Sequence, residues 1–183
     1  MAEPIGRLEL IIGNMFSGKS SELIRRINRE RSIHKKVLII NYSGDNRYSK
    51  DSVTTHDLTK VKCLKVEKLN DINHHMIQQY DSFFIDEGHF FKDLYTFVID
   101  VIENFNKNVT VSGLDGDFNR QPFGDIIKLI PICDTVDKLT AYCNKCNNGT
   151  LAPFTKKLIK NESIIDIGSI EKYIPVCRNH YFN

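Results

Sequence analysis

LELIIGNMFSGKSSELIRR, residues Leu8–Arg26, is the stretch that decides how the rest of this 183-residue chain is interpreted. An apolar run from Leu8 to Ile12 ends at a glycine, and the next residues have the spacing G-x-x-x-x-G-K-[ST]. That spacing predicts a strand, a phosphate-binding loop and a helix start, because the glycines let backbone N–H groups surround a phosphate chain while the helix directs its positive end at it. Lys19 would reach the outer phosphates, and Ser20 would hold Mg²⁺. The predicted nucleotide-binding residues are Gly13, Asn14, Met15, Phe16, Ser17, Gly18, Lys19 and Ser20.

A chance match in an ordinary strand-to-helix turn is the alternative to this interpretation. The residues after the loop favour the phosphate site, because they have the pattern of an amphipathic helix that packs on a sheet. Leu23, Ile24 and Ile27 form its apolar side. Its water-facing side would contain Glu22, Arg25, Arg26, Arg29 and Glu30.

Composition limits the kind of protein this is. A chain with 41% hydrophobic residues can bury one good core and leaves room for a small appendage. The 25 basic and 23 acidic residues give a formal charge of +2, so we expect no nucleic-acid partner. No apolar run approaches the roughly 20 residues that cross a bilayer, and the first residues lack a signal-peptide layout. We therefore expect a soluble, cytoplasmic protein without membrane association.

Further apolar runs indicate an α/β fold with a mostly parallel central sheet. Buried strands are predicted at Val37–Ile40, Ser82–Ile85 and Val109–Ser112, and one short strand at Val61–Val66. Helices are predicted at Leu69–Gln79 and Leu94–Phe105, and a long polar loop over the strand ends at Tyr42–Thr59. The segments Asp125–Ile132 and Asp134–Tyr142 would return the chain to the sheet.

Two carboxylates, Asp86 and Glu87, follow the strand Ser82–Ile85 directly. Acids at strand ends are common in loops, but with an upstream phosphate loop they indicate phosphoryl transfer. Asp86 would act on Mg²⁺ through water, and Glu87 would accept a proton from an attacking hydroxyl.

Other polar and aromatic residues are candidates by their location at the same edge of the sheet. Asp45, Arg47 and His56 lie in the polar loop, where each is otherwise an ordinary solvated residue. Leu114 and Phe118 flank a glycine-rich turn and would either wall an aromatic base or fill the core.

Near the C-terminus, Cys143 and Cys146 form one C-x-x-C pair, and Cys177 and His180 form a second pair with the same spacing. Four such ligands suit tetrahedral Zn²⁺ and predict a closed structural site, whereas a disulfide is a poor interpretation for an intracellular chain. The other two cysteines, Cys63 and Cys133, are expected in the core. The polar segment Asn147–Val176 would loop out from the metal and serve as a lid. We thus expect an ATP-binding domain over residues 1–141 and a zinc-binding domain over residues 142–183.

The chain resembles type II thymidine kinases, the cytosolic and poxviral kind. Beyond the phosphate loop, the matching motifs span nearly the whole chain in the family's order: Gly44–Tyr48, Asp86–Phe91, Gly113–Phe118, Arg120–Gly124, Lys138–Ala141 and Tyr173–Cys177. The resemblance implies a RecA-like sheet with a small zinc domain and a lasso loop. It also implies transfer of the γ-phosphate of ATP to the 5′-hydroxyl of thymidine or deoxyuridine, feedback inhibition by dTTP, and a homotetramer.

The same resemblance implies a role for particular residues. Lys19 would bind the donor phosphates, Ser20 and Asp86 would manage Mg²⁺, and Glu87 would be the general base. Arg47, two residues after Asp45, would balance charge at the phosphoryl group. The residues that would surround the thymidine are Met15, Phe90, Leu114, Phe118, Phe123, Thr155, Ile167, Gly168 and Tyr173.

Three residues depart from the family's pattern. Asn14 stands where proline is usual, His89 where glutamine is usual, and His180 where a last cysteine is more familiar. We expect the first change to be mild and the second to alter substrate affinity or pH dependence; the third keeps a zinc ligand.

Two other functions compete with this interpretation. One is a different nucleoside or nucleotide kinase with a phosphate loop, which the lasso pattern disfavours. The other is a nucleic-acid-binding zinc ribbon fused to an ATPase, which the near-neutral charge disfavours.

Overall fold

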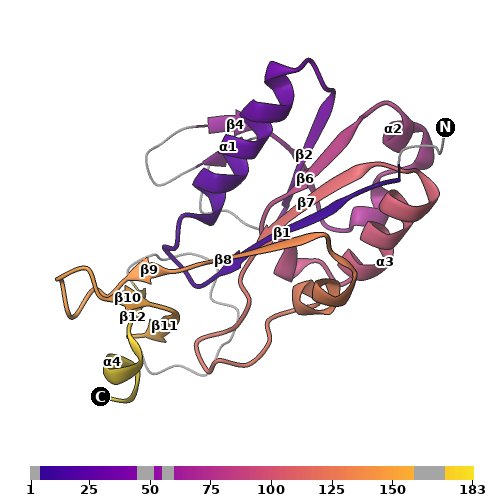
Figure 1. The fold of residues 1–183 in the computed structure, drawn as a ribbon. Coiled ribbons are helices and arrows are strands. Elements are labelled where there is room, and N and C mark those ends of the chain that lie inside the picture. Colours follow the sequence, from indigo (N-terminus) through magenta and orange to yellow (C-terminus); the bar gives the residue numbers. More distant parts are fainter. Residues whose placement is uncertain (1–4, 45–51, 55–59, 159–171) are drawn as a thin grey trace.

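A computed structural model describes residues 5–44, 52–54, 60–158 and 172–183. Its centre is a sheet of six strands, all parallel to their neighbours, which confirms the predicted α/β class (Figure 1). In spatial order the strands are β5 (Leu64–Val66), β2 (Val37–Tyr42), β6 (Ser82–Ile85), β7 (Asn108–Gly113), β1 (Leu8–Gly13) and β8 (Thr135–Leu139).

The four central strands, β2, β6, β7 and β1, are buried on both faces, which explains why their sequences are mainly apolar, whereas the edge strands β5 and β8 are partly exposed. Alternate residues of β1 point to opposite faces: Leu10 belongs to one hydrophobic cluster and Ile11 to the other. Helix α1 (Lys19–Ser32) covers the face of Ile11 with the three apolar residues that the sequence pattern predicts, Leu23, Ile24 and Ile27. The opposite face is covered by α2 (His74–Gln78), α3 (Leu94–Ile99) and the short helical segment η4 (Ile126–Ile132) (Figure 1).

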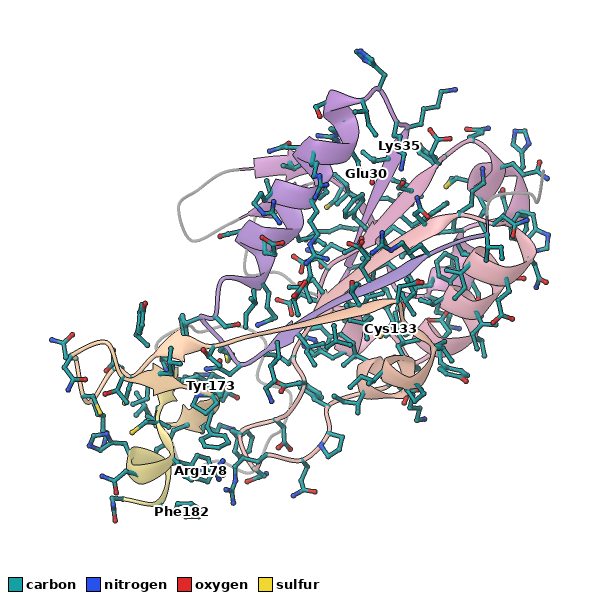
Figure 2. The ribbon with its side chains drawn as sticks, viewed as in Figure 1. Glu30, Lys35, Cys133, Tyr173, Arg178 and Phe182 are labelled. Atoms are coloured by element: carbon teal, nitrogen blue, oxygen red, sulfur yellow. The ribbon has the colours of Figure 1, made fainter. Side chains whose placement is uncertain are left out.

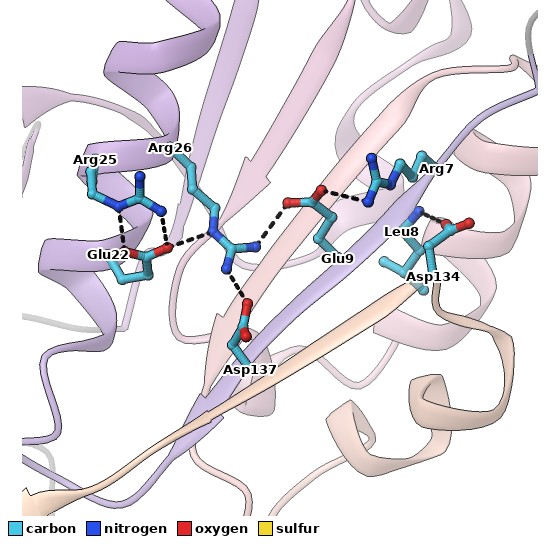
Figure 3. A network of polar contacts seen from close by, with 8 residues as sticks. All are labelled: Arg7, Leu8, Glu9, Glu22, Arg25, Arg26, Asp134 and Asp137. Atoms are coloured by element: carbon cyan, nitrogen blue, oxygen red, sulfur yellow. Dashed lines mark hydrogen bonds and ion pairs between the residues drawn. The ribbon is translucent and has the colours of Figure 1, made fainter.

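Arg26 does not face water as the helical pattern predicts. Its side chain is only 13% exposed and bonds Glu22 on α1, Glu9 on β1 at 2.8 Å, and Asp137 on β8 (Figure 3). The helical period places Arg26 at the border of the apolar side, and the carboxylates on the sheet draw it inward. This arginine therefore ties α1, which begins at the phosphate loop, to the two strands beneath it.

Several predicted elements are divided in the structure. The predicted strand Val61–Val66 is two strands: β4 (Lys60–Lys62) pairs antiparallel with β3 (Ser52–Thr54), and β5 joins the main sheet. Strand β3 also interrupts the predicted loop Tyr42–Thr59. The chain thus leaves one sheet and enters another at a single residue, Cys63, which alternation within so short a run does not reveal.

The two predicted helices are also modified. Residues 69–79 contain a single turn, η1 (Leu69–Asp71), and then α2, because Ile72 is extended and the Asn73 side chain caps a new helix by accepting a hydrogen bond from the Met76 N–H. The second prediction holds more closely: α3 continues through a π-helical turn, η3 (Asp100–Asn104), and faces the core.

The C-terminal part forms a separate small body of secondary structure. Strand β9 (Ala141–Tyr142) pairs with β10 (Leu151–Ala152), β11 (Phe154–Lys157) pairs with β12 (Tyr173–Val176), and α4 (Arg178–Phe182) ends the chain. The segment 147–176 is therefore not simply a loop, because its described parts form three strands. Its residues share their own hydrophobic cluster with Cys143 and Cys177.

Two smaller observations complete the fold. Cys63 and Cys133 are half-buried at the edges of the two main clusters rather than inside the core as predicted. Within the described residues, every helix is too short or too polar to cross a membrane.

Candidate active site and metal centre

The predicted catalytic residues meet at the carboxyl edge of the parallel sheet. The phosphate loop follows β1, the two carboxylates follow β6, and the segment Leu114–Phe118 follows β7, which lies between β1 and β6. Strand ends of a parallel sheet share one edge, so segments separated by about seventy residues come together there.

Hydrogen bonds among its own residues hold the phosphate loop in shape. The Nζ of Lys19 donates to the Asn14 carbonyl oxygen at 2.7 Å, and the Ser17 hydroxyl donates to the same oxygen at 2.8 Å. Gly18 precedes α1 in the left-handed conformation, so the helix starts at Lys19. A lysine folded onto its own loop lies beside the position where phosphates bind in such loops.

Ser20 and Asp86 form the part of the site that suits a hard cation. The Ser20 hydroxyl donates to Oδ2 of Asp86 at 3.4 Å, and the Asp86 residue is 4% exposed. Burial raises the pKa of Asp86 well above its ordinary value, the adjacent Glu87 raises it further, and Lys19 acts to lower it. Because a divalent cation would favour the ionised carboxylate, this hydroxyl and carboxylate fit Mg²⁺.

Glu87 is held in an unusual backbone conformation at the same edge. Its φ of 52° is left-handed, and its side chain is 16% exposed beside the imidazole of His89. The rings of Phe90 and Phe123 lie against that imidazole, with centroids 4.2 and 4.7 Å away, and the Leu114 N–H bonds it. Glu87 and three of the predicted thymidine residues therefore surround one histidine.

Two further pairs of predicted thymidine residues are brought together across long sequence distances. The Met15 N–H donates to Oγ1 of Thr155 at 3.1 Å, so β11 contacts the phosphate loop. The rings of Phe118 and Tyr173 lie 6.3 Å apart, and the Lys157 ammonium sits 4.8 Å from the Phe118 centroid. The predicted residues outside the described ranges are Asp45, Arg47, His56, Ile167 and Gly168.

Several contacts between the two parts of the chain were not predicted from the sequence. The Asn14 side chain donates to the Phe154 carbonyl oxygen and accepts from the Ala141 N–H, both at 3.4 Å, so this departure from the family pattern sits in the junction. Lys157 belongs to none of the sequence motifs. Only the alternation of side chains along β11 could have suggested that Lys157 and Thr155 lie on the same face.

The segment that contains Phe118 is also fastened to the C-terminal helix. The Tyr181 hydroxyl donates to the Phe118 carbonyl oxygen at 2.8 Å, and the Arg120 guanidinium lies 4.4 Å from the Tyr181 ring and 4.8 Å from Phe182. Figure 2 shows Tyr173 and Phe182 in this C-terminal part. Aromatic and cationic side chains therefore link the segment after β7 to the helix that carries His180.

The four predicted metal ligands form a cluster whose ligand atoms all lie within 4.8 Å of one another. The sulfurs of Cys146 and Cys177 are 3.8 Å apart, and the Nδ1 of His180 lies 3.6, 3.3 and 3.4 Å from the sulfurs of Cys143, Cys146 and Cys177. A tetrahedral zinc with Zn–S bonds of about 2.3 Å requires sulfurs about 3.8 Å apart. The donor set and spacing therefore fit a structural zinc ion.

The surroundings of the Cys143 thiol favour the thiolate form that a metal binds. Burial acts to raise its pKa, but the N–H groups of Cys177 and Cys146 and the His180 ring outweigh burial and lower the pKa to about 6. The Cys177 N–H lies 3.3 Å from the Cys143 sulfur. Backbone donors of this kind stabilise the thiolate that zinc binds.

Comparison with known proteins shows the family to which the chain belongs. A family model described as thymidine kinase matches residues 6–181. Thymidine kinase 1 of Dictyostelium discoideum is 42% identical over 180 residues, 96% of this chain and 78% of that protein. The thymidine kinase of Variola virus is 43% identical over 178 residues, 97% of this chain and 98% of the viral protein, and that of Oryza sativa is 38% identical over 97% of this chain and 67% of its own length. The chain belongs to the thymidine kinase family.

Proposed function

We propose that this chain transfers the γ-phosphate of ATP to the 5′-hydroxyl of thymidine. Family membership supports a kinase that uses ATP and thymidine. The observation that carries the proposal is the meeting of the phosphate loop, the Asp86–Glu87 pair and the Leu114–Phe118 segment at one edge of the sheet. Such an edge is where open α/β sheets bind their ligands.

Each polar residue has a distinct task in the proposed transfer. Lys19 and the loop N–H groups bind the ATP phosphates, and Ser20 with Asp86 holds Mg²⁺, which neutralises phosphate charge when bound. Glu87 accepts the proton of the 5′-hydroxyl while the hydroxyl oxygen forms a bond to the γ-phosphorus. The bond from that phosphorus to the bridging oxygen of ADP breaks, so the products are dTMP and ADP. Asp45 and Arg47 complete the phosphate side in this proposal.

In our proposal, the thymine lies on the opposite side of the site from the ATP phosphates. Phe118 and Tyr173, held near each other, would line it, and Met15, Phe90, Phe123, Leu114 and Thr155 would shape the rest of the pocket. The segment around Ile167 and Gly168 would close over the base as a lasso, with its ends anchored by zinc through Cys143, Cys146, Cys177 and His180. Residues 1–141 would then bind ATP and residues 142–183 would provide the lid.

The proposal extends to the setting of the enzyme. Deoxyuridine would be a weaker substrate, because it lacks only a methyl group. The end product dTTP would inhibit by feedback, and the enzyme would be a cytoplasmic homotetramer, as the resemblance implies.

ATP-dependent phosphorylation of thymidine, deoxyuridine, deoxycytidine and a purine deoxynucleoside tests the proposal directly. A lid that reads the thymine edge leaves buried groups unpaired against deoxycytidine, so we expect kcat/KM for deoxycytidine to be lower by roughly 10³-fold or more. Glu87→Gln should lower kcat by about 10²–10⁴ while both substrates still bind. Equal efficiency on thymidine and deoxycytidine would contradict the specificity, and near-normal kcat in Glu87→Gln would contradict the base.

A further inference from the structure

His89 is enclosed by a site that fits an imidazole on every side. Its side chain is fully buried, with the Phe90 and Phe123 rings against it. Two glycines make room for it: a Cβ at position 113 would lie 2.9 Å from Nδ1, and one at Gly124, whose φ is +63°, would lie 2.1 Å from the His89 carbonyl oxygen. The ring has little freedom to rotate, so the direction of each nitrogen is defined by the fold.

The hydrogen bond to Leu114 determines where the imidazole proton resides. The Leu114 N–H donates to Nδ1 of His89 at 3.0 Å, and a backbone amide has only a hydrogen to offer. Nδ1 must therefore accept, and the neutral ring carries its proton on Nε2. That nitrogen lies 3.5 Å from Oε2 of Glu87, close enough for the carboxylate to approach it as an acceptor, although the two atoms do not have hydrogen-bond geometry in this structure.

We infer that His89 is a positioning residue: the Leu114 N–H fixes its Nε2–H tautomer, and that N–H holds the Glu87 carboxylate in place for proton abstraction. This inference rests on the proposed role of Glu87 as the general base. Catalytic hydrogen bonds are often long without substrate and tighten in the complex, which a separation of 3.5 Å allows.

The same ring connects two parts of the site. Leu114 begins the segment after β7 that we place beside the thymine, whereas Glu87 follows β6. A substrate that packs against Leu114 therefore contacts a residue whose backbone amide is linked, through the His89 ring, to the general base Glu87. Misplacement of a catalytic group by about 1 Å can cost up to about 10²-fold in rate, so this brace has a measurable consequence.

Two substitutions separate the functions of the two ring nitrogens. In His89→Asn the amide oxygen occupies the position of Nδ1 and can accept from Leu114, but nothing reaches Glu87. In His89→Gln the longer side chain brings an amide N–H to the position of Nε2. We expect His89→Asn to lower kcat by about 10- to 100-fold with the KM for ATP nearly unchanged, and His89→Gln to keep kcat within about threefold of the original.

The tautomer is measured on the unaltered protein, and His89→Gln is needed only to assign the signal. Two-bond ¹H–¹⁵N spectra distinguish the tautomers, and the signal of His89 among the six histidines is the one that disappears in His89→Gln. An Nδ1–H tautomer, or equal kcat losses in folded Asn and Gln variants, would overturn the inference. A normal kcat in His89→Asn, together with an inactive Glu87→Gln, would also overturn the inference. An active Glu87→Gln would instead refute the assignment of Glu87 as the general base.

Discussion

Arg26→Met should destabilise the protein far more than the same change at its neighbour Arg25. Both arginines bond Glu22, but the Arg25 side chain is 61% exposed and that of Arg26 only 13%. Arg26 also bonds Glu9 and Asp137 on two strands (Figure 3). Methionine retains most of the aliphatic stem, so the variant isolates the guanidinium.

The magnitude follows from how buried the partners are. Removing one member of a fully buried ion pair costs about 3–5 kcal/mol, and removing one member of an exposed pair costs about 1 kcal/mol or less. Glu9, Glu22 and Asp137 are 28%, 20% and 54% exposed, so Arg26 falls between the two cases, at about 2–3 kcal/mol. For a chain of this size that lowers the melting temperature by about 4–12 °C, and Arg25→Met should lower it by about 4 °C or less.

Thermal unfolding at one protein concentration, followed by circular dichroism, measures both variants. Added salt should reduce the difference in melting temperature between the original protein and Arg25→Met more than the difference for Arg26→Met, because exposed ion pairs are screened more strongly. If Arg26→Met melts no lower than Arg25→Met, the network does not stabilise the packing of α1 on the sheet, and our description of its role is wrong.

Three further outcomes are expected. Hydrogen bonds from Arg25 and then Arg26 lower the pKa of Glu22 from 4.5 to about 2, so its contribution to stability is present above pH 4.5 and lost as pH falls toward 2; the stability advantage of the original protein over Glu22→Gln should shrink across that range and not grow. Elemental analysis of protein purified without added metal should find one zinc per chain, and His180→Ala should weaken thymidine binding more than ATP binding; activity with well under one zinc would contradict the structural site. Lys157→Met should raise the KM for thymidine without changing that for ATP, because its ammonium lies over Phe118, and equal changes in both constants would refute that placement.

Local features of this protein could be predicted from its sequence because neighbouring residues alone encode them. The glycine spacing before Lys19 specifies a loop between strand and helix, and that helix begins at Lys19. Apolar runs such as Val37–Ile40 mark strands buried on both faces, and the apolar run Ser82–Ile85 located the two carboxylates that follow it. The C-x-x-C and C-x-x-H spacings likewise indicated two pairs of metal ligands, since each pair lies on one short segment, and the four ligands form one cluster in the structure.

The contacts between distant segments were decided only by the tertiary structure. Periodicity tells which face a residue occupies, but not which side chain from another element arrives there. Arg26 lies inside because Glu9 and Asp137 stand on the strands beneath it, and Thr155 reaches Met15 because β11 packs on the phosphate loop. The proton on His89 has the same origin: its place depends on the Leu114 amide, twenty-five residues along the chain, which the parallel pairing of β6 with β7 brings to the ring.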